Sequence, residues 1–193
     1  MSTETSQVDL VGEAAVRNIV RAALFAALTG AAAYVSFPNP LSAGVPVTLQ
    51  VLAVFLAGIY LGPAYGFASM TLYLVAGAAG VPVFSGGAAG LGQLLGPTGG
   101  YLWSYPFAAA VIGFLVHGRT LGSPGRASTA RLVGAMVGGV VVIYAFGITG
   151  LYLATPLGPV AAVVSGAAAF LPVELVKMAA AVAVVRSDAA SAE

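Results

Sequence analysis

The sequence predicts an all-α membrane protein, a single bundle of six transmembrane helices with N- and C-termini in the cytoplasm. Of its 193 residues, 60% are hydrophobic and only 7% are charged, whereas soluble domains carry about 25% charged residues. The 26 glycines fit membrane helices, which pack closely through small residues. The apolar stretches between polar or Pro- and Gly-rich turns have about the length of a bilayer crossing. We therefore expect lipid to contact much of the surface.

Helix-breaking or polar residues bound each apolar stretch. The first ends at Pro38-Asn39-Pro40, and Gly62-Pro63 separates the second from the third. A Gly-rich segment precedes the fourth, and the polar loop HGRTLGSPGRASTAR precedes the fifth. Pro172 suits the first turn of the last helix, and we expect a short helix or re-entrant stretch over 156–171. The expected helices span residues 18–37, 45–61, 64–80, 99–116, 132–153 and 172–185.

The basic residues give the orientation. They fall before the second turn of the first helix, in the loop between the fourth and fifth helices, and after the last helix: Arg17, Arg21, Arg119, Arg126, Arg131 and Arg186. The loops at 38–46, 81–98 and 154–159 contain neither Lys nor Arg. Because basic loops stay in the cytoplasm, both termini are predicted to lie inside. Residues 1–16 and 187–193 are then cytosolic tails around one transmembrane domain, 17–186.

Composition excludes several classes of function. Without cysteine there is no disulfide, no thiolate metal site and no cysteine nucleophile. Both aspartates, Asp9 and Asp188, lie in the predicted tails, and the single histidine, His117, ends the fourth helix, so no metal site or other cofactor site is expected. The P-loop pattern is absent, so transport driven by ATP would require another subunit.

Glu174 and Lys177 are the ionisable residues predicted inside a helix and away from the cytosolic side. They are three positions apart, so they share one face. Each costs about 2.5–3.5 kcal/mol near the bilayer centre on insertion scales, and such residues usually face a cavity or a partner. The alternative is an ion pair that only fixes the helix, or a lysine that reaches the interface.

Two further segments contain candidate binding residues. Residues 81–103 hold seven glycines and two prolines, and Gly-rich backbone at membrane depth occurs only where it lines a cavity or is buried. Its side chains of interest are Phe84, Gln93, Thr98, Tyr101 and Trp103. The segment VPVTLQ contributes Thr48 and Gln50, at the outer end of the second helix. The alternatives are an outer loop with interfacial aromatics, and capping or packing residues.

The first helix carries small residues at a spacing of four. Ala22 with Ala26, and Ala23 with Ala27, each form a small-xxx-small pattern, which gives a flat surface for close helix contact. Packing inside the bundle requires the same residues, so the pattern alone leaves both interpretations open.

Three motifs in order, VPVTLQ, GVPVFSGGAAGLGQLLGPTGGYLW and LPVELVK, resemble the BioY family. Its members are the biotin-specific substrate-binding subunits (S components) of energy-coupling factor (ECF) transporters, and the similarity covers nearly the whole chain. The resemblance implies a six-helix bundle with a vitamin site near the outer face. It also implies partners, namely a transmembrane coupling subunit and ATPase subunits, and a location in the cell membrane.

The resemblance also assigns residues. Glu174 and Lys177 match the family's acidic residue and lysine, which are implied to hold the ureido ring of biotin. The apolar part of the vitamin would lie against Phe84 and Tyr101. The helix surface that contacts the coupling subunit falls on Ala23 and Ala27, or one residue earlier. The family commonly carries Asp at the position of Glu174, so the hydrogen-bond geometry here is expected to differ.

Other functions remain open at this point. The chain could carry biotin by itself, or it could serve a related vitamin or a biotin precursor. An intramembrane enzyme would need clustered catalytic groups, and only one Glu–Lys pair is available. A structural or assembly protein would bind no small molecule.

Overall fold

The computed structural model describes residues 12–42, 44–118, 122 and 124–191. Most of the predicted N-terminal tail, Arg119 and residues 192–193 lie outside these ranges. The α-helices are α1 (Glu13–Ala32), α2 (Gln50–Ala78), α3 (Leu91–Leu95), α4 (Gly99–His117), α5 (Thr129–Ala154), α6 (Pro159–Gly166) and α7 (Leu171–Ser191). The shorter elements are the 3₁₀ turns η1 (Ser85–Gly87), η2 (Pro124–Arg126) and η3 (Ala168–Phe170), and the strands β1 (Ser36–Phe37) and β2 (Val47–Thr48).

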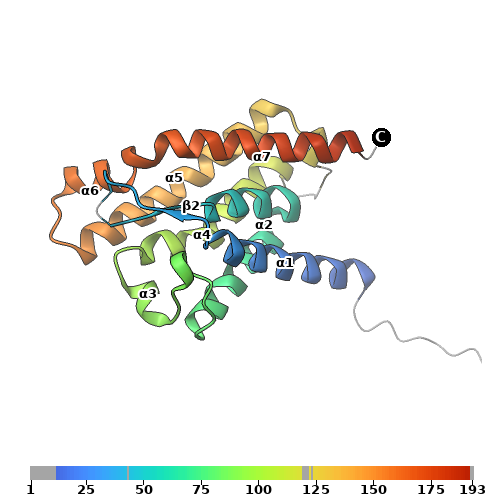
Figure 1. Cartoon of the computed structure of the whole chain (residues 1–193). Helices are drawn as coiled ribbons and strands as arrows, with labels where there is room; N and C mark the ends of the chain where they lie inside the picture. Colours follow the sequence, from blue (N-terminus) through green and yellow to red (C-terminus); the bar gives the residue numbers. More distant parts are fainter. Residues whose placement is uncertain (1–11, 43, 119–121, 123, 192–193) are drawn as a thin grey trace, which may run out of the picture.

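The predicted all-α membrane bundle is confirmed. In the described part of the chain, five helical stretches are long and apolar enough to cross a membrane, with α6 to α7 taken as one stretch. One of them, α2, contains a break and accounts for two of the six predicted helices. Figure 1 shows the start of α1 and the end of α7 at the same end of the bundle.

The break in α2 lies at Gly62. This residue has φ 71° and ψ −175°, a conformation that favours glycine, and Pro63 cannot continue the hydrogen bonds of the first leg. The second leg folds back on the first, since a Cβ built at Gly66 would lie 3.4 Å from the carbonyl oxygen of Ala57. The sequence-based separation into helices 45–61 and 64–80 therefore corresponds to the two legs.

Helix α4 lies at the centre of the bundle and α1 at its edge. Of the most apolar 18-residue window, 61% is buried in α4 and 22% in α1. Glycines allow α4 to approach its neighbours closely: a Cβ added at Gly150 of α5 would lie 2.9 Å from the Cα of Gly100. Such contacts bind membrane helices together by close packing where no hydrophobic effect acts between them.

The predicted boundaries near the first loop were wrong. The first helix ends at Ala32 rather than Phe37, and the second begins at Gln50 rather than Val45. The intervening residues form the hairpin β1–β2, in which Ser36 pairs with Thr48. The reason is proline: Phe37 precedes Pro38 and Val45 precedes Pro46, and a residue before proline is biased toward extended backbone.

The last apolar region begins as predicted, but its final helix ends later than predicted. The short helix expected over 156–171 is α6, followed by η3, and α7 begins one residue before Pro172. Helix α7 continues to Ser191, into the region interpreted as a tail, and is longer than expected.

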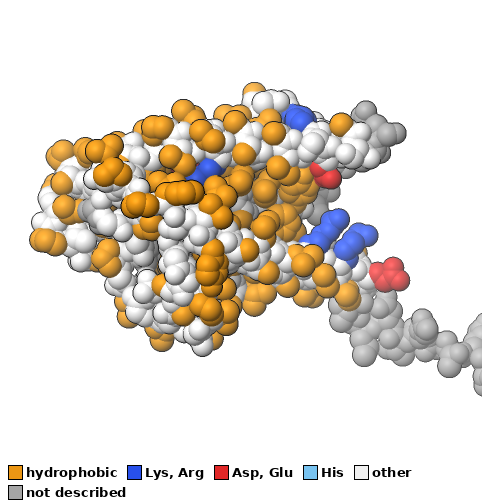
Figure 2. All heavy atoms as spheres, viewed as in Figure 1, with side chains coloured by type: hydrophobic (Ala, Val, Ile, Leu, Met, Phe, Trp, Pro, Cys, Tyr) orange, Lys and Arg blue, Asp and Glu red, His pale blue; other side chains and the backbone are white. Residues whose placement is uncertain are grey.

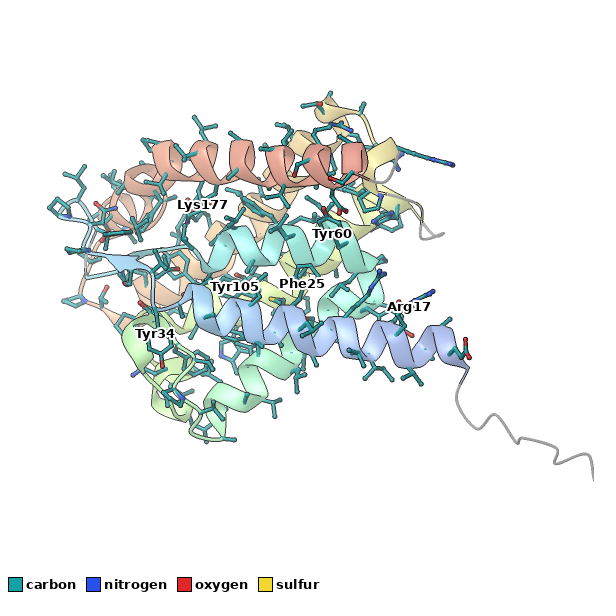
Figure 3. All side chains as sticks on the ribbon, turned by 45° about the vertical axis from the view of Figure 1, so that its right-hand side comes forward. Arg17, Phe25, Tyr34, Tyr60, Tyr105 and Lys177 are labelled. Atoms are coloured by element: carbon teal, nitrogen blue, oxygen red, sulfur yellow. The ribbon has the colours of Figure 1, made fainter. Side chains whose placement is uncertain are left out.

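Charged side chains gather at the end of the molecule where α1 begins and α7 ends (Figure 2). Arg17 is labelled at this end in Figure 3. The predicted cytoplasmic location of this end stays a prediction.

Candidate functional site

A cavity lies toward the opposite end of the bundle, near the start of α7. Its empty volume is about 610 Å³ when the open space at its mouth is included. All seven predicted substrate-binding residues line it: Thr48, Gln50, Phe84, Gln93, Tyr101, Glu174 and Lys177. The structure thus brings together residues from β2, α2, the Gly-rich segment, α4 and α7.

Glu174 and Lys177 form a buried ion pair in this cavity. They lie in the first two turns of α7, and Lys177 Nζ donates to Glu174 Oε1 over 2.8 Å. Their exposed fractions are 4% and 3%, so both charged side chains are buried inside the protein. Figure 3 shows Lys177 on the face of α7 that is turned toward the other helices.

The pair leaves hydrogen-bonding capacity unused. Glu174 Oε2 is buried and has no partner among the described residues. An ammonium group has three donors, of which one is directed at Glu174. A buried polar atom without a partner lowers the stability of the fold by about 1–3 kcal/mol. An ion pair that served only to fix the helix would therefore leave this loss of stability uncompensated.

A chain of hydrogen bonds fixes Gln50, which lines the cavity at the start of α2. Thr48 Oγ1 donates to Gln50 Oε1 over 2.9 Å, and Gln50 Nε2 donates to the hydroxyl of Tyr73 over 2.5 Å. These bonds hold the Gln50 amide in one orientation, and its second N–H remains for a ligand.

Aromatic rings form an apolar wall. Phe84, which is 1% exposed, meets Tyr73 edge-on with ring centroids 5.6 Å apart, and Tyr73 stacks on Tyr105 at 6.2 Å. Gly77 leaves the space that the Phe84 ring occupies. The Tyr101 hydroxyl donates to the Gly166 carbonyl over 2.6 Å, so Tyr101 presents its ring rather than a free hydroxyl.

The Gly-rich segment covers one side of the cavity with short polar groups. Ser85, Gln93 and Thr98 line the cavity, and glycines at positive φ shape the backbone within η1, at Gly86, and just before α3, at Gly90. The Ser85 hydroxyl lies 3.2 Å from that of Ser36 in β1. The segment is therefore packed against the β hairpin rather than being a loose outer loop.

Trp103 does not belong to the cavity lining. It is 47% exposed, and its indole N–H donates to the Leu94 carbonyl over 3.1 Å. It therefore ties α4 to α3, while Thr98 from the same predicted segment does line the cavity.

Sequence reasoning missed Tyr144 of α5. It lines the cavity, and its buried hydroxyl oxygen is, with Glu174 Oε2, one of two buried side-chain polar atoms without a partner in the described residues. A signal existed: Tyr144 is a polar hydroxyl in the middle of an apolar helix, whereas tyrosines of membrane helices are enriched at the interfaces.

The two alanine pairs of α1 face different ways. Ala22 and Ala26 are 6% and 7% exposed, and the Ala22 carbonyl accepts a hydrogen bond from Ser69 Oγ over 2.7 Å. Ala23 and Ala27 are exposed. Ala22 and Ala26 therefore pack inside the bundle, which corrects their inclusion in the predicted partner surface.

Polar groups at the other end are used within the chain. His117 accepts from the Gly122 N–H at Nδ1 over 3.2 Å, so Nε2 carries the proton and donates to the Ile59 carbonyl over 2.6 Å. Arg186 donates to the carbonyls of Gly125 and Ala127 over 2.7 Å each. Among the described residues there is no group of three or more side chains that could hold a metal ion.

A membrane helix bundle with a partly polar cavity, such as the described residues form, is typical of a membrane-embedded binding protein. The comparisons with known proteins agree. The BioY family model matches residues 2–192, and the chain belongs to the BioY family, as the sequence motifs indicated.

Named relatives have nearly the same length. The probable biotin transporter BioY of Pyrococcus horikoshii is 39% identical over 167 residues, which cover 86% of this chain and 92% of the relative. The biotin transporter BioY of Rhizobium etli is 39% identical over 168 residues, 83% and 87% of the two chains. These relatives are transporters and not enzymes.

A solved structure shares the fold. The crystal structure of the S-component for biotin from an ECF-type ABC transporter superposes with a TM-score of 0.81 at 25% identity. The match covers 92% of this chain and 93% of that one.

Proposed function

We propose that this chain binds biotin in the cavity and is the substrate-specific subunit through which an ECF-type transporter takes biotin up. The observation that carries the proposal is the buried Glu174–Lys177 pair, whose second carboxylate oxygen has no partner among the residues described. The relatives named as biotin transporters support the choice of ligand.

The ureido group of biotin matches what the pair offers. It has two N–H donors and one carbonyl acceptor, and hydrogen bonds to charged groups are the stronger kind. One ureido N–H would donate to Glu174 Oε2, and the ureido carbonyl would accept from Lys177 Nζ. The unpaired hydroxyl of Tyr144 can donate to the same carbonyl or accept the second N–H.

The rest of the cavity suits the rest of the ligand. The thioether ring and the valerate chain are apolar, and the rings of Phe84, Tyr101 and Tyr105 line the cavity. Gln50 and Gln93 offer neutral donors, with Thr48 positioning Gln50. Glu174 stands where the family commonly has Asp, and its side chain is longer by one methylene group. We expect the hydrogen-bond geometry at the ureido ring, and the choice between biotin and a biotin precursor, to depend on this difference.

We further propose partners and location. The chain lacks a P-loop, so the energy that drives biotin uptake would come from ATPase subunits and reach this chain through a transmembrane coupling subunit. The exposed Ala23 and Ala27 would provide the close-packing surface on α1. The proposed location is the cell membrane, which the chain would cross several times with both termini in the cytoplasm. The described Arg residues gather at the end of the bundle where α1 begins and α7 ends (Figure 2), and basic residues mark the cytoplasmic side of a membrane protein.

Uptake of labelled biotin tests the proposal. A bacterial host without biotin transport or synthesis would express the chain alone, the chain with coupling and ATPase subunits, or the variant Glu174→Gln/Lys177→Met with the same subunits. We expect accumulation with the complete set and none above background with the variant. Equal accumulation by the variant would contradict the proposed site, and full accumulation by the chain alone would favour a self-sufficient carrier.

A further inference from the structure

The cavity holds one cation, and that cation is already paired. Among the described residues lining the cavity, Lys177 is the single basic side chain, and its ammonium donates to Glu174 over 2.8 Å. The sequence extends this observation, because the segments 38–46, 81–98 and 154–159 contain no Lys, Arg or His. The arginines described belong to the opposite end of the bundle (Figure 2).

Biotin carries a carboxylate at the far end of its valerate chain, away from the ureido ring. The two ends of an extended ligand cannot both reach one ion pair on a single helix face. With the ureido ring at Glu174 and Lys177, the carboxylate lies against another wall. Apart from the tyrosines, the other polar side chains that line the cavity are neutral: Thr48, Gln50, Ser85, Gln93 and Thr98.

The geometry points to a site that recognises the ring of biotin and is indifferent to the charge of its tail. Neutral hydroxyl and amide groups donate to a carboxylate, but they donate to an amide or ester carbonyl as well. The substrate class is therefore biotin together with derivatives whose carboxyl group is amidated or esterified. This inference rests on the proposed function and assigns the specificity of the same site.

The inference has a quantitative consequence. A hydrogen bond to a cation in a site shielded from water contributes at least about tenfold to affinity. A site with such a contact would lose that factor when the carboxylate becomes a neutral group of the same size. A site without it would keep the affinity within about tenfold.

Competition between labelled biotin and biotinamide for the purified chain tests the inference. Biotinamide has nearly the shape of biotin and lacks the charge, and Glu174→Gln/Lys177→Met gives the background of non-specific binding. We expect dissociation constants for biotin and biotinamide within about tenfold of each other. If biotin binds and biotinamide binds more than about tenfold more weakly, the inference is overturned while the proposed function stands. If labelled biotin itself does not bind, the proposed function fails and the inference falls with it.

Discussion

The two ends of the bundle use their polar side chains in different ways. At the end that carries the arginines, Arg186 donates to two backbone carbonyls and to Thr129, and His117 uses both ring nitrogens within the chain. At the cavity end, Glu174 Oε2 and the Tyr144 hydroxyl are buried without partners in the part of the chain that the structure describes. The difference teaches that burial of a polar group alone does not indicate a candidate binding site, whereas hydrogen-bonding capacity left unused beside a cavity does.

The strongest test of this comparison changes the ion pair. Replacing Lys177 alone would leave a buried unpaired carboxylate, which costs about 3–5 kcal/mol of stability. The double variant Glu174→Gln/Lys177→Met removes both charges and avoids that cost. We expect it to stay folded and to lose at least about 100-fold in biotin affinity, because two charge-assisted hydrogen bonds disappear. Calorimetry and thermal unfolding would measure the two effects, and affinity within about threefold of the original would contradict the comparison.

At the opposite end of the bundle we expect a substitution to lower stability and to leave biotin affinity unchanged. Arg186→Met removes three hydrogen bonds, to Gly125, Ala127 and Thr129, and leaves two carbonyls at the loop before α5 without that donor. We expect a loss of about 2–3 kcal/mol in the free energy of unfolding with biotin affinity unchanged. Arg17→Gln, at an exposed position of α1, is the matched control with little effect on either. A selective loss of affinity in Arg186→Met would show that the two ends are coupled.

Tyrosine hydroxyls sharpen the comparison within the cavity. Tyr144→Phe removes a hydroxyl that has no partner among the described residues, so stability should be kept and biotin affinity should fall about 5- to 10-fold. Tyr101→Phe removes the hydrogen bond to Gly166 and should cost about 1 kcal/mol of stability. Loss of stability in Tyr144→Phe without loss of affinity would assign that hydroxyl to the fold.

The exposed face of α1 gives the smallest effect on the isolated chain, and its buried face provides the contrast. Ala22→Leu places a larger side chain in the packed interior and should cost about 1–3 kcal/mol. Ala23→Leu lies on the exposed face and should leave both stability and biotin binding unchanged. Co-purification with the coupling subunit should nevertheless fall in Ala23→Leu, and normal co-purification would remove Ala23 from the proposed partner surface.

Much of the site could be predicted from sequence because ionisable and amide side chains are rare in membrane helices. Glu174 and Lys177 stand out for that reason, and Thr48, Gln50 and Gln93 adjoin the breaks between helices. Tyr144 was missed because one tyrosine in an apolar stretch gives no indication of which way it faces. Its position in the cavity depends on the packing of α5 against α4, where Gly100 and Gly150 meet.

The fold was predictable to a similar extent. Gly62-Pro63 marks the break in α2, since glycine and proline act locally. The ends of α1 and α2 were misplaced because apolar composition continues through Ser36–Phe37 and Val47–Thr48, where proline and pairing between the strands decide the conformation. The inward register of Ala22 and Ala26 also required the structure, because a spacing of four residues suits an inner and an outer face equally well.

Titration of biotin into the purified chain alone, freed of any vitamin that co-purifies, tests the central claim most directly. The account predicts saturable binding of one biotin per chain without any coupling or ATPase subunit, since all the polar groups proposed to hold the ureido ring belong to this chain. No heat and no displacement of labelled biotin, in protein shown to be folded, would contradict it.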